Sequence, residues 1–594
     1  MDIFLRQAPH SKIHFQRTIY RLFLAVVSLL SFLIPSFGQE IGAYKTRASG
    51  DFNQASIWEV WNGSTWENTS QKPGSTQDIY IDQGHTLRLL GSESVKSIYL
   101  HAGTGAGQKL NLNNFNLDVY GVLAAFSGPA PGQPRSAWNS QNWIGNSPNS
   151  TLTFKGESRV IVDKASWSAQ TTQSRFGVIF DPGPGQELTL QAPIKALSFR
   201  VRSGTLYQKN DLSSSSSTCF TLSFNTENSL FGSGAFGNFT VEEGATFRST
   251  CNAQMIHRAG ATPALLFDLQ RGATLLLEGQ DPKIEAANLT LDGTLIFRGN
   301  QGPMNFLSSS LSTSAKPTQV RHLLIDGEAD LLLPPNLILR GNLLQMGQGG
   351  FQLAPTQLTL NGEEDQSLNT QTLLLGSLIL QKTAGKVSLA CDLSIYRSLT
   401  MVEGILDFQG YDLALNTSSL GTFNYQAGSW QKLGRFSYFG LPSILTPTSG
   451  TFPFEDLFNG GFRGLQILGP TLAGGNLTIE FIERRGANHD ANFQDVDGME
   501  ILYQLNSHFK VSANPNLGQE ELSLRISADS LLLDQVGDLR IVSRGQAAPG
   551  LPNPGVQAEY PWAKRTLKWS ELFDTELTIG SYWEATVLPL RGKN

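Results

Sequence analysis

The chain has 594 residues, with 44 Lys and Arg against 50 Asp and Glu, so its formal net charge is −6. Charged residues make up only 16% of the chain, which argues against a nucleic-acid partner because neutralising phosphates requires clustered Lys and Arg. The apolar fraction of 40% is ample for a core, and the composition excludes a coiled coil and a disordered polymer. Among the classes of protein considered, the composition is therefore most typical of a polar, turn-rich protein of the all-β class.

Residues 1–38 have the pattern of a secretory signal peptide. Basic residues precede an apolar run from Leu22 to Ile34, and small residues follow at Ser36 and Gly38. The run is about 13 residues long, shorter than the roughly 20 residues of a membrane-spanning helix. We therefore expect cleavage after Gly38, export through the Sec pathway, no transmembrane segment in the mature chain, and a secreted or cell-surface location.

From about Asp78 to about Asn416 the chain carries many short apolar-x-apolar segments, such as Leu275–Leu277 and Leu289–Leu291, separated by Gly, Asn, Asp or Ser. This period-2 alternation indicates strands with one buried face. About 340 residues of one pattern are too many for a single sandwich, whereas a parallel β-helix stacks coils of roughly 20–30 residues. We predict an N-terminal cap over 39–90 and a right-handed parallel β-helix over 91–430.

Tryptophans are concentrated early in the chain. Trp58, Trp61 and Trp66 are predicted to close the N-terminal end of the solenoid as a hydrophobic cap. Trp138 and Trp143 lie instead in a Pro- and Gly-rich insertion, and they are the candidates for stacking on sugar rings because loops commonly carry function.

Residues 431–594 show a different spacing. Their strand candidates, such as Leu477–Phe481 and Leu522–Ile526, are longer and further apart than those before them. The spacing is typical of an antiparallel β-sandwich of roughly 150 residues. Such a domain would also cover the open C-terminal edge of the solenoid, which would otherwise pair with strands of other chains.

Three stretches carry a family resemblance. Residues 48–89 contain Trp58, Pro73-Gly74, Asp78-x-Tyr80-x-Asp82 and Gly84-His85-Thr86-Leu87, and they resemble the G8-like opening of β-helix regions in exported bacterial surface proteins. Residues 358–415 and 450–580 are similar to the last repeat and the following sandwich of such proteins. The resemblance implies a large surface protein, often exported by a type IX system through a C-terminal sorting domain that is not visible here. It implies no catalytic residues.

Three cysteines and one acidic turn supply the remaining site candidates. Cys219 and Cys251 are the candidate disulfide of an exported protein, and Cys391 has the setting of a small buried side chain. Asp490, Asn492, Asp495 and Asp497, with Glu500 nearby, form a candidate calcium site, because hard cations bind oxygen ligands at about 2.5 Å. The alternative is a solvated acidic turn, since the spacing differs from that of an EF-hand. No other cofactor is predicted.

Three functions remain open. The first is a structural or adhesive surface protein without evident catalysis, whose partners are extracellular glycans or other surface proteins. The second is a carbohydrate-active β-helix enzyme, a hydrolase or lyase, although the scattered acidic residues form no obvious pair at the 5–10 Å or so that glycoside hydrolysis requires. The third is a glycan-binding module. The G-x-G-x-x-G match at residues 232–237 precedes a strand pattern rather than a helix, so we interpret it as a turn.

Overall fold

The computed structural model is almost entirely β, so the predicted all-β class is confirmed. The predicted signal peptide lies outside the described residues. Helical structure within them is limited to the single turns η1 (Ala55–Ile57), η3 (Val536–Asp538), η4 (Gln557–Glu559) and η5 (Trp569–Glu571). No helix in this part of the chain has the length and apolar character needed to cross a bilayer. The structure describes residues 40–101, 108–126, 144–145, 149–156, 159–160, 162–163, 176–190, 194–211, 218–220, 222–224, 238–252, 254–258, 266–286, 288–309, 317–352, 356–416, 421–471, 474–513, 518–533, 535–582 and 588–589.

The N-terminal end begins with an antiparallel ribbon that continues as a parallel sheet. Strand β1 pairs antiparallel with β3, and β3 with β4, whereas the other side of β1 pairs parallel with β5. The strands of this sheet are β1 (Tyr44–Thr46), β3 (Trp58–Trp61), β4 (Trp66–Asn68), β5 (Ile79–Ile81), β8 (Ile98–His101), β11 (Leu123–Phe126) and β14 (Val162–Asp163). A small parallel sheet beside it contains β2 (Gly50–Asp51), β6 (Leu87–Arg88) and β9 (Leu110–Asn111).

The following strands form further sheets, mainly parallel, and successive strands of the chain are added to different sheets in turn. We call these sheets, together with the N-terminal one, the stack. Strands β15 (Gly177–Asp181), β16 (Glu187–Leu190) and β17 (Ile194–Ala196) belong to three different sheets. Strands β18 (Ser198–Val201), β19 (Thr205–Gln208) and β22 (Leu222–Phe224) extend the same three sheets in the same order. One sheet contains β7 (Glu93–Val95), β10 (Leu117–Val119), β12 (Thr151–Lys155), β15 (Gly177–Asp181), β18 (Ser198–Val201), β23 (Asn238–Val241), β26 (Leu266–Leu269) and β29 (Asn288–Leu291). Shorter parallel sheets contain β17 (Ile194–Ala196), β22 (Leu222–Phe224), β25 (Gln254–Arg258), β28 (Lys283–Ile284) and β32 (Ser308–Ser309), and β31 (Met304–Asn305), β35 (Leu331–Leu332) and β38 (Phe351–Gln352). Strands β20 (Asn210–Asp211) and β21 (Thr218–Cys219) form a separate antiparallel pair.

The longest sheet runs through most of the stack. Its strands there are β13 (Arg159–Val160), β16 (Glu187–Leu190), β19 (Thr205–Gln208), β24 (Thr246–Ser249), β27 (Thr274–Leu277), β30 (Thr294–Phe297), β33 (Thr318–Val320), β34 (His322–Ile325), β36 (Asn336–Leu339), β37 (Leu343–Gln345), β39 (Gln357–Leu360), β40 (Gln366–Asn369), β41 (Leu373–Leu389), β42 (Leu393–Asp407), β43 (Leu413–Asn416), β44 (Thr422–Tyr425), β45 (Ser429–Gln431) and β46 (Phe436–Phe439). Its strand pairs within the stack are parallel, as in β27 with β30 and β30 with β34.

Rows of apolar side chains fill the interior of the stack. Parallel register places Phe239 directly between Phe199 and Phe267, with ring centroids 6.0 and 5.4 Å apart. In the neighbouring sheet, Leu295 pairs with Leu275 on one side and Leu323 on the other, and all three are fully buried. Because each row is repeated by the next strand, every apolar side chain is covered by its equivalent, which is why short alternating segments suffice to build the core.

Outward-facing positions pair opposite charges between neighbouring strands. Lys155 lies 2.7 Å from Asp118, and Arg298 lies 2.6 Å from Asp326. Stacking like charges in register would repel, so this arrangement lets a parallel sheet carry charges on its solvent face.

The last part of the chain, residues 440–589, forms antiparallel sheets, and we call it the head. One sheet contains β47 (Ile444–Leu445), β48 (Thr451–Phe452), β49 (Leu465–Pro470), β56 (Glu521–Ser527), β59 (Leu551–Asn553) and β60 (Trp562–Lys568). The other strands of the head extend the long sheet and are β50 (Asn476–Ile482), β51 (Ala487–Asn488), β54 (Tyr503–Leu505), β55 (His508–Ala513), β58 (Arg540–Val542) and β61 (Thr575–Ser581). Two short pairs complete it: β52 (Phe493–Gln494) with β53 (Glu500–Ile501), and β57 (Leu531–Leu532) with β62 (Leu588–Pro589).

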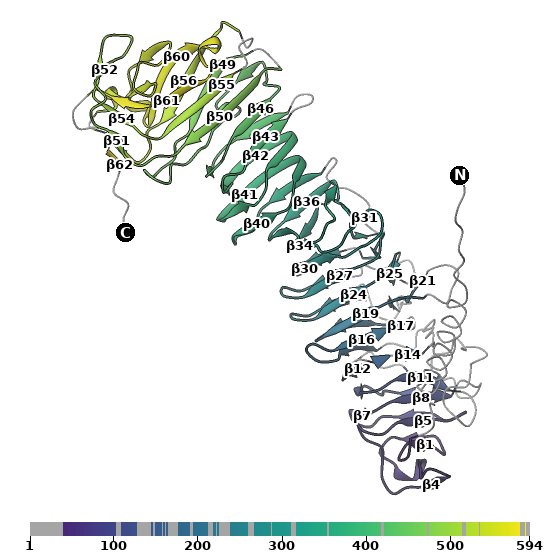
Figure 1. Ribbon diagram of the computed structural model, residues 1–594. Coiled ribbons are helices and arrows are strands. Elements are labelled where there is room, and N and C mark those ends of the chain that lie inside the picture. The colour runs from purple at the N-terminus through teal and green to yellow at the C-terminus, as the bar shows by residue number, and fades with distance from the viewer. Residues whose placement is uncertain are drawn as a thin grey trace, which may run out of the picture.

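Strand β46 joins the stack to the head without a break in hydrogen bonding. It pairs parallel with β43 on one side and antiparallel with β50 on the other. Buried residues also form one continuous apolar cluster from Tyr44 at the start to Ile579 in β61. Figure 1 shows the result as an elongated body in which β1 and β61 lie near opposite ends.

The early tryptophans have two different environments. Trp58 is fully buried in the main core, and its indole N–H donates to the Phe52 carbonyl oxygen at 3.0 Å. Trp61 and Trp66 pack instead against a second, smaller cluster that contains Tyr80. The ribbon containing the three tryptophans therefore covers the end of the stack, but only Trp58 enters its interior.

Candidate functional site

The sequence-predicted sugar-stacking residues Trp138 and Trp143 lie outside the described residues. The candidate disulfide does not: Cys219 and Cys251 are bonded, with Cα atoms 5.4 Å apart. The bond ties β21 to Cys251, which lies two residues beyond the end of the core strand β24. Cys391 is a free, buried cysteine, with the Thr370 hydroxyl 3.2 Å from its sulfur.

The candidate calcium residues are not arranged as a ligand set. The Asp495 carboxylate is buried and receives two hydrogen bonds of 3.0 Å from the Arg565 guanidinium. Asp497 lies 3.6 Å from Arg540, and Asp490 accepts a hydrogen bond from the Asn492 amide. Throughout the described ranges, no group of three or more His, Cys, Asp or Glu side chains is arranged to hold a metal ion. The Arg565 charge takes the place that a cation would have at Asp495.

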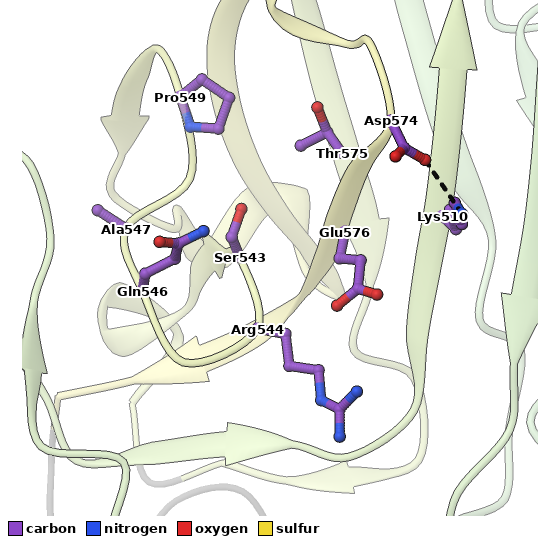
Figure 2. A pocket seen from close by; sticks show the side chains of 9 residues that line it. All are labelled: Lys510, Ser543, Arg544, Gln546, Ala547, Pro549, Asp574, Thr575 and Glu576. Carbon is purple, nitrogen blue, oxygen red and sulfur yellow. Dashed lines mark ion pairs between the residues drawn. The ribbon is translucent and has the colours of Figure 1, made fainter.

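An open polar pocket of about 380 Å³ lies on the head, close to this buried pair (Figure 2). One wall is the loop that follows β58, and the other is formed by β55 and the start of β61. The lining residues are Lys510, Ser543, Arg544, Gln546, Ala547, Pro549, Asp574, Thr575 and Glu576.

The pocket exists because β58 leaves its neighbour early. Strand β58 pairs with β61 only as far as Val542 opposite Thr578, whereas β55 on the other side continues to pair as far as Thr575. After Val542 the chain makes a tight turn, in which Gly545 adopts a φ of 72° and Ser543 bridges Gln546. The side of β61 that β58 vacates thus faces a loop rather than a strand.

Two buried polar side chains hold that loop from within the head. The Gln504 side-chain amide donates to the Ser543 carbonyl oxygen at 2.6 Å, and its own oxygen accepts from the Gly545 N–H at 3.0 Å. Arg565 donates to the carbonyl oxygens of Ile541 at 2.9 Å and of Pro549 at 2.6 Å. Because hydrogen bonds of this kind are strong when buried, they fix the loop backbone before any ligand arrives.

The pocket carries charges of both signs. Lys510 pairs with Asp574 at 3.1 Å, and hydrogen bonding to that carboxylate raises the pKa of Lys510. Glu576 stands directly opposite Lys510 across the β55–β61 pair. Arg544 is exposed on the loop, and Figure 2 shows it on the wall that faces β61, which carries Glu576.

The pocket continues a row of alternating charges across the outer face of the long sheet. Arg435 pairs with Glu480 at 2.9 Å, and Glu480 is the register partner of Lys510 on β55. Lys510 is in turn opposite Glu576 on β61. The row begins where the stack ends and leads into the pocket.

A second hollow, of about 430 Å³, lies on the stack. Its wall combines apolar side chains such as Leu289 and Leu332 with polar groups, among them Asn305, whose amide donates to the Asp281 carboxylate at 3.1 Å. Asp281 also forms an ion pair with Lys283. The polar groups of this hollow are thus largely satisfied by one another.

Comparison of the chain with protein-family models, with curated proteins and with solved structures gives no match. Its function must therefore be argued from its own residues. The pocket could not be predicted from the sequence, because Arg544 and Glu576 lie in separate segments that only the folded sheet places around one hollow. The Pro- and Gly-rich stretch that follows β58 is the one local signal of a loop with unusual geometry.

Proposed function

We propose that the chain is a secreted or cell-surface protein with a structural and adhesive role. In this proposal the stack is a right-handed parallel β-helix that acts as a rod, and the head is a β-sandwich carried at its end. The observation that supports it is the unbroken hydrogen-bonded sheet from β13 to β61, because a head joined through a shared sheet keeps a fixed orientation on its support.

Export is supported by two features of the chain. Residues 1–38 have the charge and hydropathy pattern of a signal peptide. The bond between Cys219 and Cys251 fits an oxidising compartment, where disulfides persist. The G8-like and type IX resemblance of the sequence supports the same location.

Binding and turnover assays test the adhesive role. The mature chain, residues 39–594, is incubated with intact bacterial cells and with immobilised polysaccharides, and the retained protein is measured together with newly released reducing ends and unsaturated sugars. Retention without turnover supports the proposal. Turnover of any polysaccharide would replace it with the alternative of a carbohydrate-active enzyme, and no retention on any surface would refute the adhesive role.

A glycan-binding role is the second candidate, and the polar pocket on the head favours it. Its wall combines Arg544 and Gln546, exposed on a loop that the protein interior holds in place, with hydroxyl and carboxylate groups at the start of β61. Pre-formed sites with a few converging polar groups are typical of ligand binding.

A further inference from the structure

Four side chains of the pocket have hydrogen-bonding capacity that the protein does not use. Within the part of the chain that the structure describes, Arg544, Gln546, Glu576 and the Ser543 hydroxyl make no side-chain hydrogen bond. Lys510 and Asp574, by contrast, are paired with each other, and the Thr575 hydroxyl donates to the Glu571 carbonyl oxygen at 2.9 Å. The groups available to a ligand are therefore a guanidinium, a carboxamide, a carboxylate and the nearly buried Ser543 hydroxyl.

We propose that this pocket binds neutral, hydroxyl-rich glycans through Arg544, Gln546 and Glu576. This inference rests on the proposed adhesive function and gives it a site and a ligand class. Hydroxyl groups both donate and accept hydrogen bonds, so one sugar can accept from the guanidinium, donate to the carboxylate and do both with the carboxamide.

The charge balance of the pocket favours a neutral ligand. Lys510 and Arg544 supply two positive charges, and Asp574 and Glu576 supply two negative ones, so the formal sum is zero. A polyanion would be attracted by Arg544 but repelled by the two carboxylates. A polycation would be attracted by the two carboxylates but repelled by the two basic side chains. A neutral sugar avoids both costs and still makes charge-assisted hydrogen bonds.

The rigidity and size of the pocket fit a small saccharide. Gln504 and Arg565 already hold the loop, so binding does not have to order it, which is a large part of the cost of association. The volume of about 380 Å³ lies within the roughly 300–1,000 Å³ of small-molecule sites. A peptide is disfavoured because only Ala547 and Pro549 offer apolar surface for a side-chain anchor.

The test measures binding of the mature chain to neutral oligosaccharides (β-glucan, mannan and galactan fragments), to polyuronate oligosaccharides and to a library of short peptides. The strongest ligand is then titrated against the parent chain, Arg544→Ala and Glu576→Gln. Arg397→Ala is the matched control, because Arg397 is an exposed arginine on β42 of the stack. Thermal unfolding of each variant checks that it is folded.

We expect a neutral oligosaccharide to bind best, with a tenfold or greater loss of affinity in both pocket variants and no change in the control; about tenfold is a typical effect of losing one charge-assisted hydrogen bond. A preference for polyuronates or peptides, or equal affinity of the parent and the folded pocket variants, would overturn the inference. If no oligosaccharide binds but the chain is still retained on cells, this inference fails and the adhesive function stands. If the chain is retained on no surface at all, the proposed adhesive function is refuted as well.

Discussion

The stack and the head satisfy their buried polar groups in different ways. In the stack, most strands lie between parallel neighbours that hydrogen-bond their backbone, and the interior consists mainly of apolar rows such as the one through Leu295. A buried charge occurs there at a turn between two strands, where the Lys382 ammonium donates to the carbonyl oxygens of Gly362 and Glu364.

In the head, loops leave the sheets and turn their carbonyl groups inward. Arg565 then donates to the carbonyl oxygens of Ala548 and Pro549 in the loop after β58, and Arg463 donates to those of Ser527 at 2.8 Å and Gly460 at 2.8 Å.

The difference shows where this chain uses buried charge. A regular ladder needs few buried side-chain donors, because every backbone group already has a partner in the next strand. Loops that fold over the end of a sheet have no such partner, so a buried arginine replaces the missing strand. The same arginine fixes the loop that forms the pocket, which links the internal chemistry of the head to its candidate site.

The largest expected effect is on the head. Arg565→Met leaves the Asp495 carboxylate buried and unpaired, and we expect a loss of about 3–5 kcal/mol in the free energy of unfolding. Urea unfolding of the full chain, followed by tryptophan fluorescence, measures it. Arg484→Met is the control, because Arg484 is exposed in the same region, and its effect should stay within about 0.5 kcal/mol.

A double variant tests whether the unpaired Asp495 carboxylate causes part of this loss of stability. Arg565→Met with Asp495→Leu removes both charges, so part of the lost stability should return, although the loop carbonyl groups remain without donors. A double variant no more stable than Arg565→Met would contradict the account of the buried pair.

The stack should respond to the loss of a side chain from its rows. Leu295→Ala removes the atoms that lie between Leu275 and Leu323, and neither neighbour can move without breaking its own ladder. We expect a loss of about 3 kcal/mol in the free energy of unfolding, within the usual range for such cavities. A loss below about 1 kcal/mol would mean that the rows are loosely packed and would contradict a closely packed interior of the stack.

A smaller effect of opposite sign is expected at the N-terminal end of the stack. Burial raises the pKa of Asp78 above its ordinary value of 3.8, and one oxygen of this carboxylate has no hydrogen-bond partner among the described residues. Lys96 is the nearest cation, 3.9 Å away. The protonated carboxyl is therefore favoured in the folded state, so its contribution to stability is present below about pH 4 and is lost as the pH rises through the folded pKa.

Asp78→Asn mimics the protonated carboxyl and tests this dependence. We expect the variant to be more stable than the parent at pH 7 and equal to it near pH 3.5, as measured by chemical unfolding across that range. A constant difference at all pH values would exclude the titration of Asp78 as the cause.

The smallest effect is expected on the solvent face of the stack. Arg298→Gln breaks the ion pair with Asp326, but both groups are partly exposed, so the change in the free energy of unfolding should be below about 1 kcal/mol. It should also shrink with added salt. A salt-independent loss as large as that of Arg565→Met would remove the contrast between surface and buried pairs.

The strands of the stack could be predicted from local pattern, and their lengths only in part. The alternation at Leu275–Leu277 and Leu289–Leu291 falls within β27 and β29. Around Leu378–Leu380 the structure has the 17-residue strand β41, which continues through Thr383-Ala384-Gly385 because its neighbour β42 pairs with it beyond that point. A local pattern does not contain the contribution of a neighbouring strand.

The buried charges and the pocket of the head could not be predicted. Asp495 and its neighbours have the composition of a cation site, and what changes the role of Asp495 is Arg565, which is 70 residues away and reaches it only after the two sheets have formed. Arg544 and Glu576 likewise become neighbours only because β58 stops pairing with β61. Such contacts depend on sheet register, which one sequence does not reveal.

Small-angle X-ray scattering of the mature chain tests the central claim, that stack and head form one extended body, most directly. Strands stacked about 4.8 Å apart along a single axis predict a radius of gyration above roughly 30 Å and a scattering curve that fits the rigid structure. A compact chain of this length would have a radius of gyration of about 25 Å. A value near 25 Å, or a curve that requires a head moving freely on the stack, would contradict the account.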